Sequence, residues 1–335
     1  MKHINIPIFI QHMGCPNQCV FCDQHAISGA HSFSFEKVRA DIESVLATAG
    51  DSECEIAFFG GSFTGIDRGL MIKLLDIAEG YVKEGRVSGI RMSTRPDYIS
   101  REITDILHGY TVSQVELGIQ SFSDKVLEAS VRGHSTEASY NAMRLLRAEG
   151  FSVVGQMMTG LPGADIETER ETARIICNEG AAAARIYPCV VFKNTPLEQM
   201  TKRGEYIPMT VDEAVERSAA AYRVFLENGV ALLKIGLHES ENLHSDDTYF
   251  AGPNHPAIGE LIRGKIYCEN ILKALENEKT EGRELTVFVP RGAVSMATGQ
   301  KRCYKENIVE KTGVKSLKIL EKESLSQYNI SIDLK

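Results

Sequence analysis

Short apolar segments alternate with longer amphipathic segments along the first two thirds of this chain. The short segments are rich in β-branched residues, are bounded by Gly, Pro or polar turn residues, and occupy residues 4–13, 55–60, 89–94, 114–120, 152–161 and 183–192. Between them, residues 35–47, 69–83, 136–148 and 166–179 have helical periodicity. Strands that alternate with helices predict βαβ units and a parallel sheet. We therefore expect an α/β fold, a partial (β/α)6 TIM-like barrel, with a doubly wound sheet as the alternative.

The pattern changes after about residue 205. A helix is expected near residues 210–228, a short apolar run spans 230–237, and a polar loop follows. Two further helices, at 258–276 and 293–311, are predicted on either side of a strand at 285–289. We expect two parts, a core partial barrel over residues 1–205 and a C-terminal α+β accessory region over residues 206–335 that packs on the barrel.

The composition is that of a globular protein. The 335 residues are 43% apolar and 24% charged, which excludes disordered, collagen-like and disulfide-scaffold chains. No stretch is long and apolar enough to cross a membrane, and the first residues have no signal-peptide pattern, so a cytoplasmic location is the simplest interpretation. The net charge of −8 argues against a chain that coats nucleic acid along its whole length.

Three of the eight cysteines carry the clearest chemical signal. Cys15, Cys19 and Cys22 form a C-x3-C-x2-C spacing directly after the first predicted strand, where α/β folds place their chemistry. Three thiolates can hold a 4Fe-4S cluster and leave its fourth iron free to bind another ligand. His25 would complete a Cys3His set, so a structural zinc site is the alternative.

Further motifs follow the cysteines in order. They are AFFGGSFTGI at 57–66, STRPDYI at 93–99, ELGIQSFSDKVL at 116–127, VRGH at 131–134 and GQMMTGLPG at 155–163. Together with the cysteines, this set resembles the radical SAM superfamily. The resemblance is to the radical SAM core of the Elongator catalytic subunit and, more distantly, to oxygen-independent coproporphyrinogen oxidase. It spans about residues 4–200.

The resemblance implies an enzyme with two cofactors, a 4Fe-4S cluster on the three cysteines and S-adenosylmethionine (SAM). Reductive cleavage of SAM would give a 5′-deoxyadenosyl radical that abstracts hydrogen from a substrate, with a tRNA base as the candidate. The positions that it implies for SAM binding are Phe21, Gly60, Gly61, Ser62, Thr94, Arg95, Gln120, Arg132 and Gln156. Arg132 matches the family arginine that meets the SAM carboxylate, and the glycine pair matches the backbone that holds its amino group.

Two departures limit what is carried over. Nothing in the chain resembles the acetyltransferase domain of the Elongator subunit, and the glycine motif ends in Ser62 where an acidic residue is commoner. The expected partners are an electron donor of flavodoxin or ferredoxin type and tRNA, with no membrane and with an unknown oligomeric state. The alternatives are a zinc-stapled RNA-binding module and a haem carrier with a radical SAM fold.

The C-terminal part holds two further features. His238, Glu239, His244 and His255 fall within one polar stretch, which is either a second metal or acid/base site or a solvated loop. Residues 291–318 contain seven Lys or Arg against two Glu, a pattern typical either of an RNA-phosphate surface or of an exposed helix face. Residues 231–335 have 15 basic and 15 acidic side chains, so the whole net negative charge lies in residues 1–230.

Overall fold

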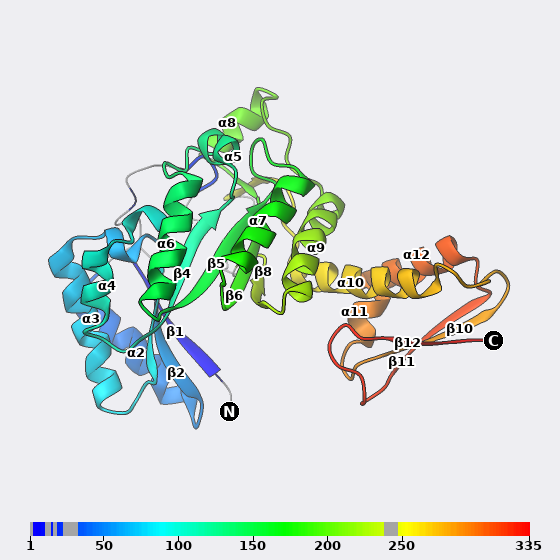
Figure 1. The fold of residues 1–335 in the computed structure, drawn as a ribbon, viewed down its shortest axis with the longest axis horizontal. Helices are drawn as coiled ribbons and strands as arrows, with labels where there is room; N and C mark the ends of the chain where they lie inside the picture. The colour runs from blue at the N-terminus through cyan, green and yellow to red at the C-terminus, as the bar shows by residue number, and fades with distance from the viewer. Residues whose placement is uncertain (1–2, 11–14, 16–18, 23–32, 238–246) are drawn as a thin grey trace.

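A seven-stranded parallel sheet forms the centre of the protein (Figure 1). The computed structural model describes residues 3–10, 15, 19–22, 33–237 and 247–335. In spatial order the strands of the sheet are β1 (His3–Phe9), β2 (Glu53–Phe59), β3 (Gly89–Thr94), β4 (Val112–Gln120), β5 (Ser152–Thr159), β6 (Ala183–Pro188) and β8 (Ala231–Ile235). Each neighbouring pair is parallel. The predicted α/β class with a parallel sheet is confirmed.

Helices connect the strands and cover one face of the sheet. They are α2 (Phe35–Ala49), α3 (Arg68–Lys83), α4 (Arg101–Leu107), α5 (Asp124–Ala129), α6 (Thr136–Ala148), α7 (Ile166–Asn178), α8 (Pro196–Lys202) and α9 (Val211–Glu227). Most of them begin at a Ser, Thr or Asp whose side chain accepts a hydrogen bond from the amide three residues later, as in α2 at Ser34 and α7 at Asp165. These caps explain why the helix starts were readable from the sequence.

The sheet curls into a half-barrel. The guanidinium carbon of Arg185, on β6, lies 5.8 Å from the centre of the Phe59 ring, on β2. Because β3, β4 and β5 lie between these two strands, a flat sheet would hold the two side chains far apart. The contact shows that the concave face closes on itself, as the predicted partial barrel requires.

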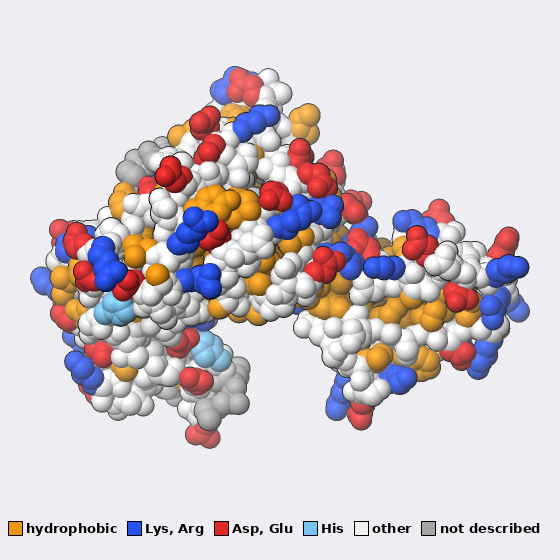
Figure 2. Space-filling model, viewed as in Figure 1, with side chains coloured by type: hydrophobic (Ala, Val, Ile, Leu, Met, Phe, Trp, Pro, Cys, Tyr) orange, Lys and Arg blue, Asp and Glu red, His pale blue; other side chains and the backbone are white. Residues whose placement is uncertain are grey.

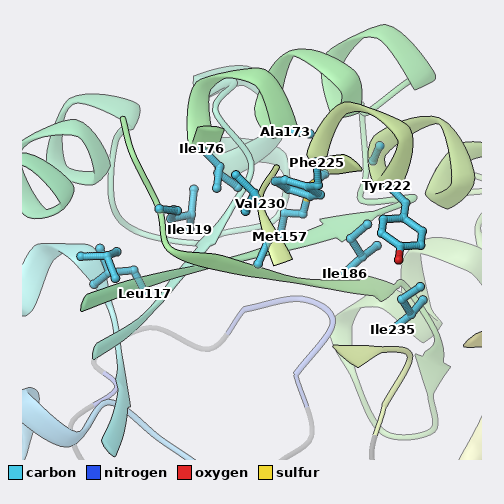
Figure 3. Close-up of a cluster of buried hydrophobic side chains, with 14 of the residues drawn as sticks. Leu117, Ile119, Met157, Ala173, Ile176, Ile186, Tyr222, Phe225, Val230 and Ile235 are labelled. Atoms are coloured by element: carbon cyan, nitrogen blue, oxygen red, sulfur yellow. The ribbon is translucent and has the colours of Figure 1, made fainter. Parts of the chain in front are cut away.

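The main hydrophobic core lies between the convex face of the sheet and the helices. Figure 3 shows Ile119, Met157 and Ile186 of the strands packed against Ile176 of α7 and Phe225 of α9, all of them fully buried. Alternate residues of the same strands point to the concave face, where polar side chains gather. This division follows from the two-residue period of a strand.

The part after residue 205 completes the sheet before it leaves the barrel. β8, which the predicted boundary at 205 places in the accessory region, pairs with β6 at the edge of the sheet. α10 (Ile258–Leu275) then packs on α9 and leads to a separate C-terminal lobe. A two-stranded ribbon of β7 (Val191–Phe192) and β9 (Tyr249–Ala251) lies at the mouth of the half-barrel, which is the end where the parallel strands finish. The division at 205 itself stays a prediction.

The C-terminal lobe contains a three-stranded sheet and two short helices. Its elements are β10 (Glu284–Val289), α11 (Val294–Thr298), α12 (Cys303–Thr312), β11 (Ser316–Glu321) and β12 (Ser331–Leu334). The single helix predicted over 293–311 is wrong, because residues with left-handed backbone break it between Gly299 and Arg302. In the described part of the chain, no helix is long and apolar enough to cross a membrane.

A cluster of tyrosines joins the lobe to the barrel. The hydroxyls of Tyr222, on α9, and Tyr328, in the loop before β12, share a hydrogen bond of 2.9 Å. Arg263 of α10 donates to both hydroxyls at 3.2 Å, and Tyr267 accepts from the Tyr328 amide. Tyr222, Tyr267 and Tyr328 are all buried, so the lobe is fixed to the barrel by a dry, directional contact.

We predict that Gly155→Ala destabilises the fold through one helix contact. A Cβ at Gly155 of β5 would lie 2.5 Å from Cγ2 of Ile176 on α7, so the helix must move. The expected cost is about 1–3 kcal/mol of unfolding free energy, measured by denaturant titration. In an Ile176→Ala background the same change should cost clearly less. Equal costs in the two backgrounds would contradict this account.

Candidate functional site

The three cysteines lie at the mouth of the half-barrel, after β1. Cys19 is buried, Cys15 and Cys22 are half-buried, and all three thiols are free of disulfides. The residue after Cys19 anchors this loop in two directions, because the Val20 amide donates to the Ser130 carbonyl at 3.1 Å and its carbonyl accepts from the amide of Leu197 at 2.9 Å. The end of the cysteine loop is therefore tied to the C-terminal end of α5 and to the first turn of α8.

Arg132 connects the cysteine loop to the sheet. Its Nη1 donates to Sγ of Cys19 at 3.5 Å, and its Nη2 donates to the carbonyl oxygen of Gly118, on β4, at 2.8 Å. A Cβ at residue 118 would lie 2.9 Å from Nη2, so any residue other than glycine would displace this guanidinium. Arg132 is 7% exposed, and its positive charge is therefore held in a largely dry site beside a thiol.

Burial and nearby charges shift the pKa values of titratable groups at the mouth. Burial raises the pKa of the Cys15 thiol, whereas the charges of Arg132 and Arg95 lower it. Burial and the neighbouring Arg132 lower the pKa of His134 to about 3, so this imidazole is neutral at pH 7. Burial is the larger effect, so the pKa of Cys15 lies above its ordinary value; the two guanidiniums oppose that rise and favour the thiolate, which is the form that binds iron or zinc.

A second polar cluster joins the ends of β2 and β3. Oγ of Ser62 and Oγ1 of Thr94 share a hydrogen bond of 2.9 Å, and the Arg95 amide donates to Ser62 at 3.0 Å. Thr64 bonds to Thr94 at 2.6 Å and donates to the carbonyl of Tyr98. Ser62 is fully buried and its hydroxyl is occupied within the protein, so its observed contacts are structural.

Arg95 is already partly engaged. Its Nε and Nη2 donate to the two carboxylate oxygens of Asp97 at 2.9 and 2.8 Å, while Nη1 has no hydrogen-bonding partner among the described residues. The forked face of this guanidinium, which is suited to a carboxylate, is thus used inside the protein. One buried donor remains for a further acceptor.

The other predicted SAM-binding positions are also at strand ends or on the concave face. Gly60 follows β2 with φ +87°, and a Cβ there would lie 3.2 Å from Cδ1 of Phe9, so the backbone needs glycine. Gln120 ends β4 with φ +69°, after a break in register. Gln156 of β5 pairs with Gly118 of β4 on one side and with Arg185 of β6 on the other. The two remaining positions are Gly61, beside Gly60, and Phe21, in the turn after Cys19 and packed on a small apolar cluster.

Unpaired polar atoms mark this mouth as a place for a polar ligand. Nη1 of Arg95, Oε1 of Gln120 and Nε of Arg132 are buried and have no partner among the described residues. Buried polar atoms are normally paired, so these three indicate a missing binding partner. Three thiols, with guanidiniums beside those of Cys15 and Cys19, fit an anionic metal cluster in their donor chemistry.

The described residues do not, however, contain a preassembled metal site of three or more His, Cys, Asp or Glu. Much of the cysteine loop, including His25, lies outside the described residues, as do His238, Glu239 and His244 of the predicted polar loop. His255 is described, and its Nδ1 accepts a hydrogen bond from the Ala257 amide. The zinc set that includes His25 therefore stays an untested prediction.

Sequence reasoning missed a charged layer on the concave face. Glu116 of β4 and Arg185 of β6 form an ion pair of 2.8 Å across β5, with 6% and 7% of their side chains exposed. Burial raises the pKa of the Glu116 carboxyl, against the lowering effects of Arg185 and Arg91. Arg91 donates to Asn5 at 3.1 Å. The only signal in the sequence was a charged residue inside each apolar strand.

Comparison with known proteins indicates the family to which this chain is related. A model described as the radical SAM superfamily matches residues 10–176, and a model of the radical SAM C-terminal domain matches residues 181–267. An uncharacterized protein of Methanocaldococcus jannaschii is 32% identical over 226 residues, which cover 63% of this chain and 68% of the relative.

Two other similarities are narrower in coverage or lower in identity. A tRNA uridine(34) acetyltransferase of the same archaeon is 35% identical over 136 residues, which are 40% of this chain but only 25% of the relative. A solved structure of the archaeal Methanocaldococcus infernus Elp3 has a TM-score of 0.62 at 22% identity, covering 82% of this chain and 63% of that one. At that identity the structural likeness shows the fold alone.

We predict that Arg132→Met disables the mouth without unfolding the protein. Methionine keeps much of the side-chain volume but removes the donors to Cys19 and Gly118. Loss of charge-assisted hydrogen bonds worth about 1.5–3 kcal/mol should reduce metal retention or cofactor affinity roughly 10- to 100-fold. Iron content after anaerobic reconstitution measures the effect. Arg174→Met, on the exposed face of α7, is the control, and equal iron content in both variants would refute the role of Arg132.

Proposed function

Because this chain belongs to the radical SAM superfamily, we propose that Cys15, Cys19 and Cys22 hold its 4Fe-4S cluster and that the enzyme modifies a tRNA base. Members of this family are enzymes that use such a cluster together with SAM. When bound, the cluster supplies the electron that cleaves SAM. The zinc-stapled module suggested by the cysteine spacing loses its support, since the family match extends far beyond the cysteines.

One observation carries the assignment of the site. The guanidinium of Arg132 donates to the thiol of Cys19 while its Nε is left unpaired within a buried mouth. A cation in this position stabilises thiolate ligands, and its free donor is available to a carboxylate such as that of SAM. Nη1 of Arg95 and Oε1 of Gln120 offer a further donor and acceptor.

The remaining predicted positions have roles consistent with this arrangement. The backbone at Gly60 and Gly61 would offer main-chain groups to the ligand, and a Cβ at Gly60 would strain that backbone and press on the Phe9 ring at 3.2 Å. Gln156 lies deeper on the concave face, next to the Glu116–Arg185 pair. That paired layer closes the bottom of the site, so the reacting groups are separated from water on that side.

The tRNA substrate rests on similarity to the core of the tRNA uridine(34) acetyltransferases. The matched stretch spans about a quarter of those proteins, so acetyl transfer is not carried over. A hydrogen-abstracting enzyme needs an external reductant, and we propose a flavodoxin or ferredoxin type of donor and a cytoplasmic location, where tRNA is found.

The cofactor assignment predicts a specific loss. Anaerobically reconstituted wild-type protein, given dithionite and SAM, should show an iron-sulfur spectrum and release 5′-deoxyadenosine. Cys22→Ser should lose the spectrum and nearly all product, because an alcohol is a poor iron ligand. Cys303→Ser, a change at an exposed thiol in the C-terminal lobe, is the matched control and should behave as wild type. Folded wild-type protein without cluster or product would sink the proposal, and haem binding in its place would favour a carrier.

The substrate assignment predicts a change in cellular tRNA. Nucleosides from digested tRNA of a deletion strain should lack one modified nucleoside that the parent strain contains. The wild-type gene should restore it and the Cys22→Ser gene should not, because the modification requires the cluster. Mass spectrometry of the nucleosides makes the comparison. Identical profiles in the parent and the deletion strain would contradict a tRNA substrate and leave the cofactor assignment standing.

A further inference from the structure

The last part of the chain forms a unit that the family does not explain. Both family models end by residue 267, whereas the C-terminal lobe begins with β10 at residue 284. The chain runs through β10, α11, a tight turn, α12 and β11 before it reaches β12. β10 lies at the centre of the sheet, parallel to β11 and antiparallel to β12. In Figure 2 this lobe projects from the barrel and carries Lys and Arg side chains along its outer end.

The turn between α11 and α12 has an unusual backbone. Gly299, Lys301 and Arg302 all have positive φ, at 77°, 49° and 66°. A Cβ at Gly299 would lie 2.6 Å from Sγ of Cys303, so the turn needs glycine at its start. Left-handed backbone at a residue other than glycine costs about 1–3 kcal/mol, and such residues concentrate at ligand clamps. Two in succession, both cationic, require an explanation other than packing.

Contacts with α10 hold this turn in place. The hydroxyl of Tyr304, in the first turn of α12, donates to the Leu261 carbonyl of α10 at 2.6 Å. At Gly264 of α10 a Cβ would lie 2.4 Å from the carbonyl oxygen of Met296, so α10 and α11 are in close backbone contact. The backbone of the turn is thereby held on α10, whereas the side chains of residues 300–302 are exposed.

The charges of the lobe differ from those of the barrel. Residues 291–318 have seven Lys or Arg against two Glu, and none of these seven forms an ion pair with any described residue, whereas the whole lobe, residues 284–334, has eight basic against six acidic side chains. On the barrel, several exposed arginines are paired, as Arg144 is with Glu179, Arg170 with Glu167 and Arg174 with Glu171. Unpaired cations on one lobe favour a polyanion as its partner.

We propose that residues 284–334 are a single-stranded RNA-binding module in which the turn Gly299-Gln300-Lys301-Arg302 clamps the sugar-phosphate backbone. In KH modules a G-x-x-G loop clamps four backbone nucleotides. Here the fourth position is Arg302 rather than glycine, and it has the left-handed backbone that glycine would adopt. The inference rests on the proposed RNA substrate and names the surface that would hold it.

The edge strand β11 does not extend this clamp. Its exposed side chains include Lys318 and Leu320, the latter 47% exposed. They alternate with Leu317, which is buried on the side of the helices, so they point away from the turn. The turn is therefore the proposed contact, and because loops of this kind clamp single strands, the module should prefer single-stranded RNA.

The test uses the full-length protein and a short single-stranded RNA oligonucleotide, with binding measured over a range of salt concentrations. The double variant Lys301→Asn, Arg302→Asn removes two charges, and asparagine tolerates left-handed backbone, so the fold is kept. We expect about tenfold weaker binding and a salt slope that is smaller by about 1.4, the value for two lost phosphate contacts on a single strand.

The control variant Arg170→Asn, Arg174→Asn removes the same charge from α7 on the barrel and should bind as the parent does. Equal weakening in both double variants, unchanged binding by the turn variant, or a preference for duplex RNA would each overturn the proposal. The turn variant should still release 5′-deoxyadenosine from SAM, so loss of RNA binding is distinguishable from failure of the cofactor assignment. If the protein binds RNA but modifies no tRNA nucleoside, the proposed function is wrong and the RNA-binding proposal stands.

Discussion

The mouth of this half-barrel depends on one buried guanidinium. Arg132 donates to the thiol of Cys19 and to the carbonyl of Gly118, and so it joins a loop that follows the first strand to the end of the fourth. Arg132 is only 7% exposed, and charge-assisted hydrogen bonds are stronger in such a buried site than in water. The missing side chain at Gly118 leaves room for this cation. Cysteine spacing alone does not create a metal site, because the thiols also need an environment that favours the thiolate.

The barrel keeps its apolar and its charged residues on opposite faces. Its convex face packs against helices and supplies the stability, whereas its concave face holds the Glu116–Arg185 pair and the Arg91 contacts. A buried ion pair of this kind contributes little net stability, because the cost of desolvating both charges offsets their attraction. Its value here is geometric, since it fills the interior below the mouth with opposite charges in contact, although Nε of Arg185 has no well-oriented hydrogen bond among the described residues. Ligands at the mouth then meet the unpaired atoms of Arg95, Gln120 and Arg132 instead.

Much of the fold was predictable because its signals are local. The helices at 136–148 and 166–178 have amphipathic periodicity and begin at side-chain caps, and the strands end in Gly or Pro turns. The break within 293–311 was missed, because the apolar periodicity continues across it and no residue type announces left-handed backbone at Lys301 and Arg302. The three cysteines were found from their spacing. The bond from Arg132 to Gly118 was not, since a contact between positions 14 residues apart, made through a strand end and a loop, leaves no periodic trace.

The two parts of the molecule would divide the work on an RNA substrate in a way that the chemistry of bases demands. An enzyme that reacts with an atom of a base must first remove that base from its stack, which costs a few kcal/mol in a duplex and much less in a loop. A lobe that clamps single-stranded backbone selects the regions where this cost is already low. The lobe can direct such a strand to the mouth only if its position is fixed, and the buried contacts of Tyr222, Tyr328 and Arg263 fix it. Rigid attachment thus follows as a requirement of the proposed division of work, and the structure has it.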